Sequence, residues 1–584
     1  MKTVPTITYH RSIPALLRKE HIMFCKAVLR STVFSICFVW SYSAHAQEAL
    51  QSLERTRPAI PDYVETEKTS DFELPKARPP ISQNNNGAPS FLLQAIKYQG
   101  NSVYSDAELN QVVQDKLQQQ VTLGDLEELR LRITNLYIKN GYINSGAVLP
   151  EQSIRDGIVT IEIVEGKLTE IELSGNLGLS DDYIISRLVT DPNAVFNLPA
   201  FQEESQLLLS DPLINKLNGQ FVPSEHLGQS KLKLQVERAK SHSVDFQTDN
   251  YGSASSGETQ GSLSLQTLNL SGAGDSLYLK LRKREGAIGA ELDYARPLNS
   301  STSNIGVRLG YNDTEVIAEQ LQSLDIQSDF KSAEVYITHP LIRSLKRQLT
   351  LGLSLSVREN QGELLDIPFS FAAGEQDGFS RVAAVRIGLT GIIRDENQAW
   401  SMYARYSQGL DMFNPTFNQN GLPDNNFSSL LLQLQYARRL NDDTQLLLRT
   451  DAQISDSPLL ALEQIAIGGA RTVRGYRENE LVRDTGYIVS AEIESSIWDN
   501  LDYSGRLGSL QAFVFTDYGE GSYKRNVLDS AKPLLSVGGG FRWQGWDRVE
   551  MEVIYGHAIR EAQEKADEIL QDRGIHLRLN CALF

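Results

Sequence analysis

The pattern of apolar and polar positions changes near residue 240, and this change divides the chain into two unlike parts. Before that point, short strand-like runs alternate with stretches of helical periodicity at 106–117, 126–140, 181–188 and 198–209. From about Lys240 to Phe584, helical periodicity mostly vanishes and apolar and polar residues alternate instead. Such alternation is typical of β-strands that have two unlike faces. The pattern predicts an α+β part followed by an all-β part.

The first part shows the same order of elements twice. A strand, two helices and two further strands occupy 91–166, and the same order recurs over 167–239. Each copy places a Gly-Asn pair directly after its first strand, as Gly100-Asn101 and Gly175-Asn176. We therefore predict two tandem α+β modules with these bounds.

The second part contains enough candidate strands for a membrane barrel. A tilted membrane strand uses ~9–11 residues, and an even strand count together with a secretory signal favours a barrel over a large soluble all-β domain. On one candidate strand, Val553 and Tyr555 share one face, whereas Glu550 and Glu552 share the other. We predict a 16-stranded transmembrane β-barrel at 240–584 with an aqueous lumen. The strands are expected near residues 246, 264, 279, 291, 308, 335, 353, 386, 403, 433, 449, 490, 514, 539, 552 and 580.

The first 90 residues have the composition of an export signal and a linker. Basic residues precede the apolar run 31–40, and Ala44-His-Ala46 gives the small-x-small pattern of a cleavage site, so a signal peptide is predicted at 1–46. Met23 is a second candidate for the start. Residues 47–90 begin with a short plug-like helical stretch at 48–54 and continue as a proline-rich linker.

Composition and charge exclude several classes of protein. A length of 584 residues calls for more than one core, and a net charge of −17 argues against a nucleic-acid partner. The mean hydropathy is −0.29, and after the signal no apolar run approaches the ~18 residues of a membrane helix. Only Cys581 remains after the signal, so we predict no disulfide and no cysteine-based metal site.

The chain shows no enzyme signature. It lacks His-Glu-x-x-His, Gly-x-Ser-x-Gly and the phosphate-binding Gly-x-x-x-x-Gly-Lys-Ser/Thr run. We therefore expect no catalytic residue, no metal and no cofactor. The excess of carboxylates leads us to expect an acidic lumen and acidic loops.

A long loop rich in glycine and arginine interrupts the alternating part at 454–486. A loop of this length inside an all-β region suggests a function. From the residues alone, Arg474 either grips a carboxylate with its guanidinium or lies in a solvated surface loop, with Asp517 merely ending a strand. The candidate site residues are Gly468, Gly469, Val473, Arg474, Gly475 and Tyr476 in the loop, and Phe515, Asp517 and Gly519 on the strand near 514.

These motifs and the order of parts resemble the outer-membrane transporters of two-partner secretion, the TpsB family, over nearly the whole mature length. The loop signature corresponds to Gly468-Gly469 and Val473-Arg-Gly-Tyr476, and the strand signature Phe-x-Asp-x-Gly corresponds to Phe515-Thr-Asp-Tyr-Gly519. The resemblance implies two POTRA modules, a loop folded into the lumen and an Arg474–Asp517 contact. Matches in the first module are Leu126, Ile133, Tyr137, Gly141-Tyr142, Pro150-Glu-Gln152, Asp156-Gly157 and Glu165-Gly166.

The resemblance implies export of one dedicated large partner exoprotein of the TpsA type from the periplasm to the cell surface. The barrel would lie in the outer membrane as a monomer, in contact with lipid, and the POTRA modules would hang in the periplasm. A general barrel-assembly factor and a passive porin are the alternatives. Two features depart from the family pattern. The plug-like helix is short, and Phe584 falls in the polar register of the last strand with His576 and Arg578.

Overall fold

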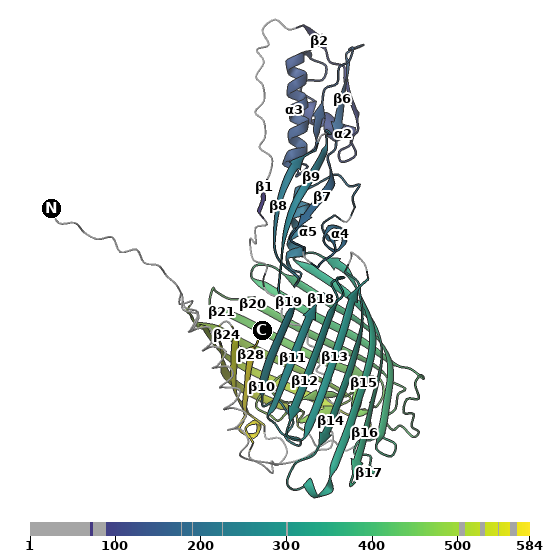
Figure 1. Cartoon of the computed structure of the whole chain (residues 1–584), viewed down its shortest axis with the longest axis vertical. Coiled ribbons are helices and arrows are strands. Elements are labelled where there is room, and N and C mark those ends of the chain that lie inside the picture. The colour runs from purple at the N-terminus through teal and green to yellow at the C-terminus, as the bar shows by residue number, and fades with distance from the viewer. Residues whose placement is uncertain are drawn as a thin grey trace, which may run out of the picture.

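The computed structural model describes residues 63, 71–73, 89–176, 178–189, 191–224, 226–298, 302–500, 508–525, 532–546, 548–560 and 569–584. The predicted signal at 1–46 and the helical stretch at 48–54 lie outside these residues. Figure 1 shows two small α+β units, one above the other, standing on one end of a large β-barrel. The predicted succession of an α+β part and an all-β part is confirmed.

The first unit packs two helices on a three-stranded sheet. Strands β3 and β6 are parallel and β5 is antiparallel to β6, which gives the order β3-β6-β5. Alternate strand residues and one face of each helix form an apolar core in which Leu109, Ile133, Tyr137 and Ile161 are fully buried. Its elements are β2 (Ser90–Leu92), β3 (Ala95–Gln99), α2 (Asp106–Val113), β4 (Gln120–Thr122), α3 (Leu123–Lys139), β5 (Gly146–Val148) and β6 (Ile158–Val164).

Both helices of this unit start at capping boxes. The backbone N–H of Glu108 donates to the Ser105 hydroxyl, and the Glu108 carboxylate accepts from the Ser105 N–H. Thr122 and Asp125 make the same reciprocal pair at the start of α3. The helix predicted at 126–140 therefore begins at Leu123, because Asp125 is the third residue of the helix and Thr122 is its cap.

The second unit repeats this arrangement around its own apolar core. Helices α4 and α5 cover a four-stranded sheet of order β1-β8-β9-β7, and Phe196, Phe201 and Phe221 pack together beneath them. No helix of the described chain is long and apolar enough to cross a membrane. The elements are β1 (Asp71–Glu73), β7 (Lys167–Ser174), α4 (Asp181–Leu188), α5 (Leu198–Leu209), β8 (Ile214–Pro223) and β9 (Gln229–Arg238).

The repeated Gly-Asn pair forms the same strand-to-helix turn in both units. Gly100 and Gly175 have φ angles of 85° and 79°, and a Cβ on either would lie 2.4 Å from a carbonyl oxygen of the neighbouring strand. The side-chain amides of Asn101 and Asn176 then donate to the aspartate that opens the following helix. The pair therefore turns the chain from strand to helix where no larger residue fits at the glycine.

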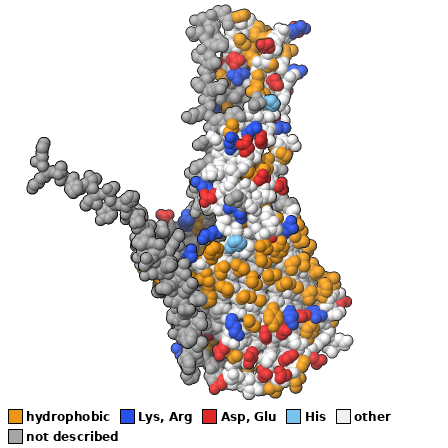
Figure 2. Space-filling model, viewed as in Figure 1, with side chains coloured by type: hydrophobic (Ala, Val, Ile, Leu, Met, Phe, Trp, Pro, Cys, Tyr) orange, Lys and Arg blue, Asp and Glu red, His pale blue; other side chains and the backbone are white. Residues whose placement is uncertain are grey.

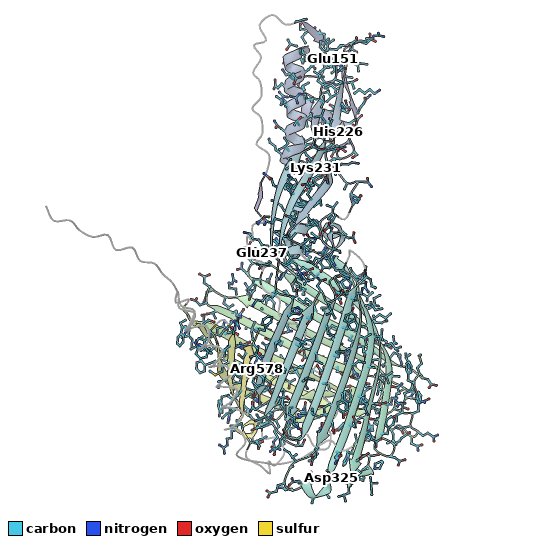
Figure 3. The ribbon with its side chains drawn as sticks, in the orientation of Figure 1. Glu151, His226, Lys231, Glu237, Asp325 and Arg578 are labelled. Carbon is cyan, nitrogen blue, oxygen red and sulfur yellow. The ribbon has the colours of Figure 1, made fainter. Side chains whose placement is uncertain are left out.

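The two units form a column that ends on the barrel. Figure 3 marks Glu151 near the free end of the column, His226 where the units meet, Glu237 beside the barrel and Asp325 at the far end of the barrel. The units join through backbone hydrogen bonds from the Phe196 N–H of the second unit to the Gly166 carbonyl oxygen at 2.7 Å and from the Leu198 N–H to the Gly141 carbonyl oxygen at 2.9 Å. The second unit touches the barrel through an ion pair of Glu204 with Arg343 at 3.2 Å.

The barrel is a closed antiparallel sheet of sixteen long strands. Each predicted centre falls within a different one of these strands, and β10 pairs with β28 to close the ring. The two-residue β17 (Ile367–Pro368) extends the hairpin after β16. The long strands are β10 (His242–Asp249), β11 (Gln260–Leu268), β12 (Ser276–Arg284), β13 (Ala287–Pro297), β14 (Asn304–Glu315), β15 (Ile326–Arg343), β16 (Arg347–Leu364), β18 (Phe379–Arg394), β19 (Gln398–Gly409), β20 (Ser428–Arg439), β21 (Thr444–Ser455), β24 (Thr485–Asn500), β25 (Gly508–Ser522), β26 (Leu534–Gly545), β27 (Val549–Ala558) and β28 (Ile575–Ala582).

The outer face of the barrel is apolar and the inner face is polar. Figure 2 shows hydrophobic side chains gathered in a band across the visible face of the wall, with many acidic side chains beyond it at the end away from the column. On β27, Met551 and Tyr555 are exposed on the outer face, whereas Glu552 is buried on the inner face. Phe584 lies two residues beyond β28, so the strand register does not place it on the polar face.

Glu165, which follows β6, holds the first unit together at the end next to the second. Its carboxylate accepts hydrogen bonds from the backbone N–H groups of Ser102 and Val103 at 2.7 and 2.8 Å, from the Tyr137 hydroxyl at 2.8 Å, and from the Ser102 hydroxyl. Burial alone would raise the pKa of Glu165, but these hydrogen bonds outweigh burial and hold the pKa below its usual value.

We expect Glu165→Ala to destabilise the first unit by about 1–3 kcal/mol, because it leaves partly buried donors without an acceptor. Limited proteolysis of the intact protein, with cleavage mapped within 89–166, measures the effect. Glu127→Ala, which removes an exposed ion pair with Arg130, is the matched control and should change little. Because the folded-state pKa of Glu165 is lowered, its contribution is present above the unfolded-state pKa of about 4.3 and is lost as the pH falls through the folded-state value.

Candidate functional site

The loop between β21 and β24 folds into the barrel rather than over its rim. It spans 456–484, close to the predicted 454–486, and its short strands β22 (Ile465–Ile467) and β23 (Leu481–Arg483) pair to form a stem. Ile465, Ile467 and Val473 of this loop are fully buried. The stem was not predicted, because strands of three residues are too short for their alternation to be recognised.

The glycine pair of the loop allows the chain to turn tightly at the top of the stem. Gly468 and Gly469 have φ angles of 112° and 103°. A Cβ on Gly468 would lie 2.8 Å from the Arg477 carbonyl oxygen, and one on Gly469 would meet the Glu478 carboxylate at 2.2 Å. Both the angle and the space therefore require glycine.

Arg474 is the centre of the site. Its Nε and Nη2 donate to the two oxygens of Asp517 on β25 at 2.7 and 2.8 Å, and its backbone N–H donates to the same carboxylate at 3.0 Å. A further guanidinium nitrogen pairs with Glu492 on β24, and the guanidinium carbon lies 3.5 Å from the ring centre of Phe515. Arg474 and Asp517 are 3% and 0% exposed, so solvent does not screen the pair.

The strand motif Phe-x-Asp-x-Gly presents three residues on one face of β25, because alternate residues share a face. Phe515 lies against the guanidinium of Arg474, and Asp517 binds it. Gly519 leaves room for the loop, since a Cβ there would lie 2.5 Å from Ile467 and 2.7 Å from Val473. Val473 and Arg474 of the loop therefore pack directly on the strand motif, whereas Gly468 and Gly469 approach only other residues of the loop.

Gly475 and Tyr476 fix the tip of the loop to the last strands of the barrel. Gly475 has a φ angle of 92°, and a Cβ there would lie 2.7 Å from the backbone oxygen of Gly556 on β27. The Tyr476 hydroxyl lies 2.9 and 2.8 Å from the carbonyl oxygens of Leu535 and Arg560, to either of which it can donate its one proton, and it accepts from the Leu535 N–H at 3.1 Å. Together with Arg474, these residues attach the tip to the strands from β24 to β27.

Several contacts of the tip lie outside both motifs and were not predicted. Arg477 forms a two-pronged ion pair with Asp572 at 2.5 and 2.8 Å, in the turn before β28. The Glu478 N–H donates to Gln571 of the same turn at 2.9 Å. The Glu492 carboxylate also binds Arg542 at 2.9 Å and so links the loop to a wider ionic network. Only the run of arginines in the loop gave a signal for these contacts.

A second ionic contact holds the base of the loop to the opposite part of the wall. Glu463 accepts from Arg386 on β18 at 2.6 and 2.9 Å and from Arg358 on β16 at 3.1 Å. All three residues are at least 92% buried. Glu463 lies in the short 3-10 turn Ala461–Glu463, just before the stem. No signal in the sequence marks this contact, since its arginines are far from either motif.

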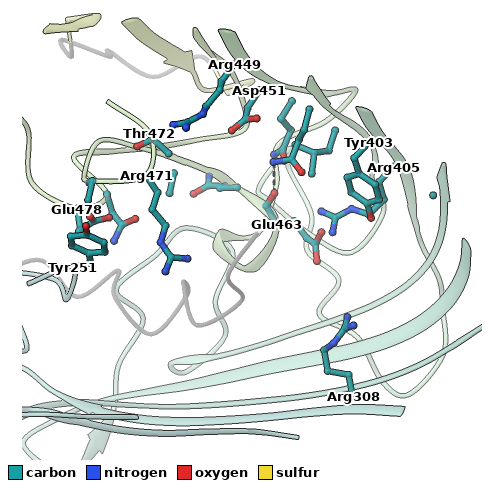
Figure 4. A pocket seen from close by; sticks show the side chains of 18 of the residues that line it. Tyr251, Arg308, Tyr403, Arg405, Arg449, Asp451, Glu463, Arg471, Thr472 and Glu478 are labelled. Atoms are coloured by element: carbon teal, nitrogen blue, oxygen red, sulfur yellow. Dashed lines mark hydrogen bonds between the residues drawn. The ribbon is translucent and has the colours of Figure 1, made fainter. Parts of the chain in front are cut away.

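The lumen beside the loop is basic, which corrects the expectation of an acidic lumen. A cavity of about 1040 Å³ is lined by eleven arginines and five carboxylates, a net of six positive charges (Figure 4). The acidic residues responsible for the overall charge of −17 lie elsewhere, many of them at the end of the barrel away from the column. Among the described residues, no group of His, Cys, Asp and Glu is suited to a metal ion.

A closed sixteen-stranded barrel with an apolar outer belt, two α+β units at one end and an inward loop defines an outer-membrane transporter of the POTRA–barrel class. The chain belongs to the haemolysin secretion/activation protein ShlB/FhaC/HecB family, which matches residues 228–543, and residues 91–166 match the ShlB-type POTRA domain. It is thus a two-partner secretion transporter, with its barrel in the outer membrane and its POTRA region in the periplasm.

Curated relatives span most of the chain at low identity. The heme/hemopexin transporter protein HuxB of Haemophilus influenzae is 25% identical over 469 residues, which cover 77% of this chain and 80% of the relative. The outer membrane transporter CdiB of Escherichia coli is 22% identical over 80% of this chain and 78% of its own length.

Solved structures share the fold. CdiB from Escherichia coli aligns with a TM-score of 0.66 at 20% identity, covering 86% of this chain and 92% of its own. CdiB from Acinetobacter baumannii aligns with a TM-score of 0.58 at 16% identity, covering 98% and 100%. BamA from Haemophilus ducreyi lacking POTRA domains 1-3 aligns with a TM-score of 0.53 at 14% identity, covering 84% of this chain and 100% of that shortened chain.

Gly475→Ala should detach the loop tip, because its Cβ meets the β27 backbone at 2.7 Å and alanine disfavours the φ angle of 92°. We expect faster tryptic cleavage after Arg471 and Arg477 and a lower temperature for loss of the heat-modifiable gel mobility. Gly421→Ala is the matched control, since Gly421 has a φ angle of 71° but a Cβ added there would have no atom within 4 Å. Equal effects of the two substitutions would contradict a close approach at Gly475.

Proposed function

We propose that this transporter exports one dedicated large exoprotein, and that the loop carrying Arg474 must leave its place in the lumen for the partner to pass. The contact of Arg474 with Asp517 carries the proposal, because it ties the loop to the wall from inside the barrel at 2.7 Å. The barrel would act as a monomer with its apolar belt in lipid, and residues 1–46 would direct the chain to the periplasm.

Release of the tip requires new partners for buried charges. Glu492 keeps Arg542 at 2.9 Å when Arg474 leaves, whereas Asp517 loses the cation that binds both of its oxygens. An unpaired buried carboxylate is unfavourable, so opening is disfavoured at rest and requires water or another donor to enter beside Asp517. The loop motif and the strand motif would thus keep the pore closed until a partner arrives.

Capture of the unfolded partner is assigned to the two α+β units, at 91–166 and 167–239. In the first unit the sheet order β3-β6-β5 leaves β3 and β5 as edges. An edge strand can pair with an extended polypeptide through main-chain hydrogen bonds, which depend little on side-chain identity. This mode suits a partner that is unfolded in the periplasm.

Arg474→Ala and Asp517→Ala should each impair export while the barrel remains folded. Removing one member of a buried ion pair leaves the other unpaired and costs about 3–5 kcal/mol. The loop is then no longer held in the defined resting position from which the partner would displace it. The double variant should be less affected in stability than the sum of the single variants, because the two residues act through one contact. Partner release into the medium is measured by immunoblot, and heat-modifiable mobility checks folding. Unchanged export in both single variants would contradict the assigned role.

Deletion of the gene tests the function as a whole. Mass spectrometry of secreted and surface proteins should show loss of one large exported protein, with other outer-membrane barrels unchanged. A general fall in barrel abundance would favour the assembly factor instead. No change in either, with the partner expressed, would favour a passive pore.

A further inference from the structure

The part of the wall that binds Glu463 also carries cationic and polar side chains that do not contact Glu463. Arg358 on β16 and Arg386 on β18 bind Glu463, and Arg405 follows on β19 in the register next to Gly388. Gln433 follows on β20, opposite Tyr403. These side chains line one cavity, and Figure 4 shows Arg405 and Glu463 projecting into it.

Two of these groups are unsatisfied among the described residues. Gln433 is 3% exposed, and neither its side-chain oxygen nor its nitrogen has a hydrogen-bond partner. The Nε of Arg405 also has none. Buried amide and guanidinium groups without partners are unfavourable and are commonly found where a ligand or water binds. Here both face an open lumen.

We propose that Arg405 and Gln433, together with Arg358 and Arg386, form a binding subsite for carboxylate side chains of the polypeptide in transit. In the resting structure Glu463 of the loop occupies the part of this subsite made by Arg358 and Arg386. The bidentate contact with Arg386 shows that the wall accepts a carboxylate in a defined orientation. This inference rests on the proposed export of an unfolded partner.

The chemistry favours an Asp- or Glu-bearing segment over a neutral or basic one. A guanidinium binds a carboxylate through two parallel hydrogen bonds, and an amide such as Gln433 can donate one more. The cavity has a net of six positive charges, so lysine-rich segments meet repulsion there. When the loop moves, an acidic side chain replaces Glu463 at Arg386 and Arg358, and Arg405 and Gln433 gain the partners that they lack at rest.

Binding of short fluorescein-labelled peptides to the purified full chain in detergent tests the subsite. The probe alternates Glu and Ser, and peptides with Gln or Lys in place of Glu are compared with it by fluorescence anisotropy. We expect the Glu peptide alone to bind, and to bind more weakly as salt increases. Equal binding of the Glu and Gln peptides would overturn the proposal.

Substitutions in the wall and in the loop should change the affinity for the Glu peptide in opposite directions. Arg405→Gln should weaken binding of the Glu peptide about tenfold, whereas Glu463→Gln should strengthen it by about as much, because the loop no longer competes for Arg358 and Arg386. Arg405→Lys, which keeps the charge, should restore part of the affinity. Lys331→Gln removes a cation on the outer face and should change nothing. Heat-modifiable mobility verifies that each variant is folded.

The peptide assay and the export assay can fail separately. If Arg405→Gln or Glu463→Gln leaves peptide affinity unchanged in folded protein, the subsite is refuted, and dedicated export still stands on the deletion experiment. If deletion leaves export unchanged, the proposed function fails even where the peptides bind.

Discussion

The positive charge of Arg474 lies inside the barrel, shielded from water, and much of the surrounding structure serves to neutralise it. A guanidinium does not lose its proton at any ordinary pH, so burial demands carboxylates at fixed positions. Asp517 binds two of its nitrogens, Glu492 binds a third, and the ring of Phe515 covers its face. These partners come from two neighbouring strands, and only a regular ladder holds them in register. The position of the loop therefore depends on the register between β24 and β25.

Ion pairs hold the loop at its tip and at its base, and the loop supplies the cation at the tip and the anion at the base. At the tip, a loop arginine binds wall carboxylates, and at the base a loop carboxylate, Glu463, binds the wall arginines Arg358 and Arg386. Between them, the stem is apolar and packs on Ile488 and Leu534. Opposite charges at the two ends orient the loop across the lumen, because reversing it would place like charges together.

Sequence alternation was sufficient to locate all sixteen barrel strands, because a wall between lipid and water imposes a period of two on every strand. The helices 181–188 and 198–209 were predicted from their periodicity with their observed bounds, and in the structure Ser180 and Asn197 cap their starts. The site was predicted only where residues form compact motifs. The partners of Glu463 could not be predicted, because they lie 105 and 77 residues away in the sequence and no local pattern marks them. The basic lumen was also missed, since overall charge does not show which face a residue occupies.

The ionic contacts of the loop also bear on the energetics of export. An ion pair that passes from one carboxylate to another within the same cavity keeps its Coulomb attraction and its desolvation nearly constant, so the exchange is close to neutral in free energy. The arginines that line the lumen can therefore exchange the carboxylate of the loop for a carboxylate of the partner without a large free-energy barrier. Such an exchange has no preferred direction. Export therefore requires a source of direction outside this exchange, such as the folding of the exported partner at the cell surface.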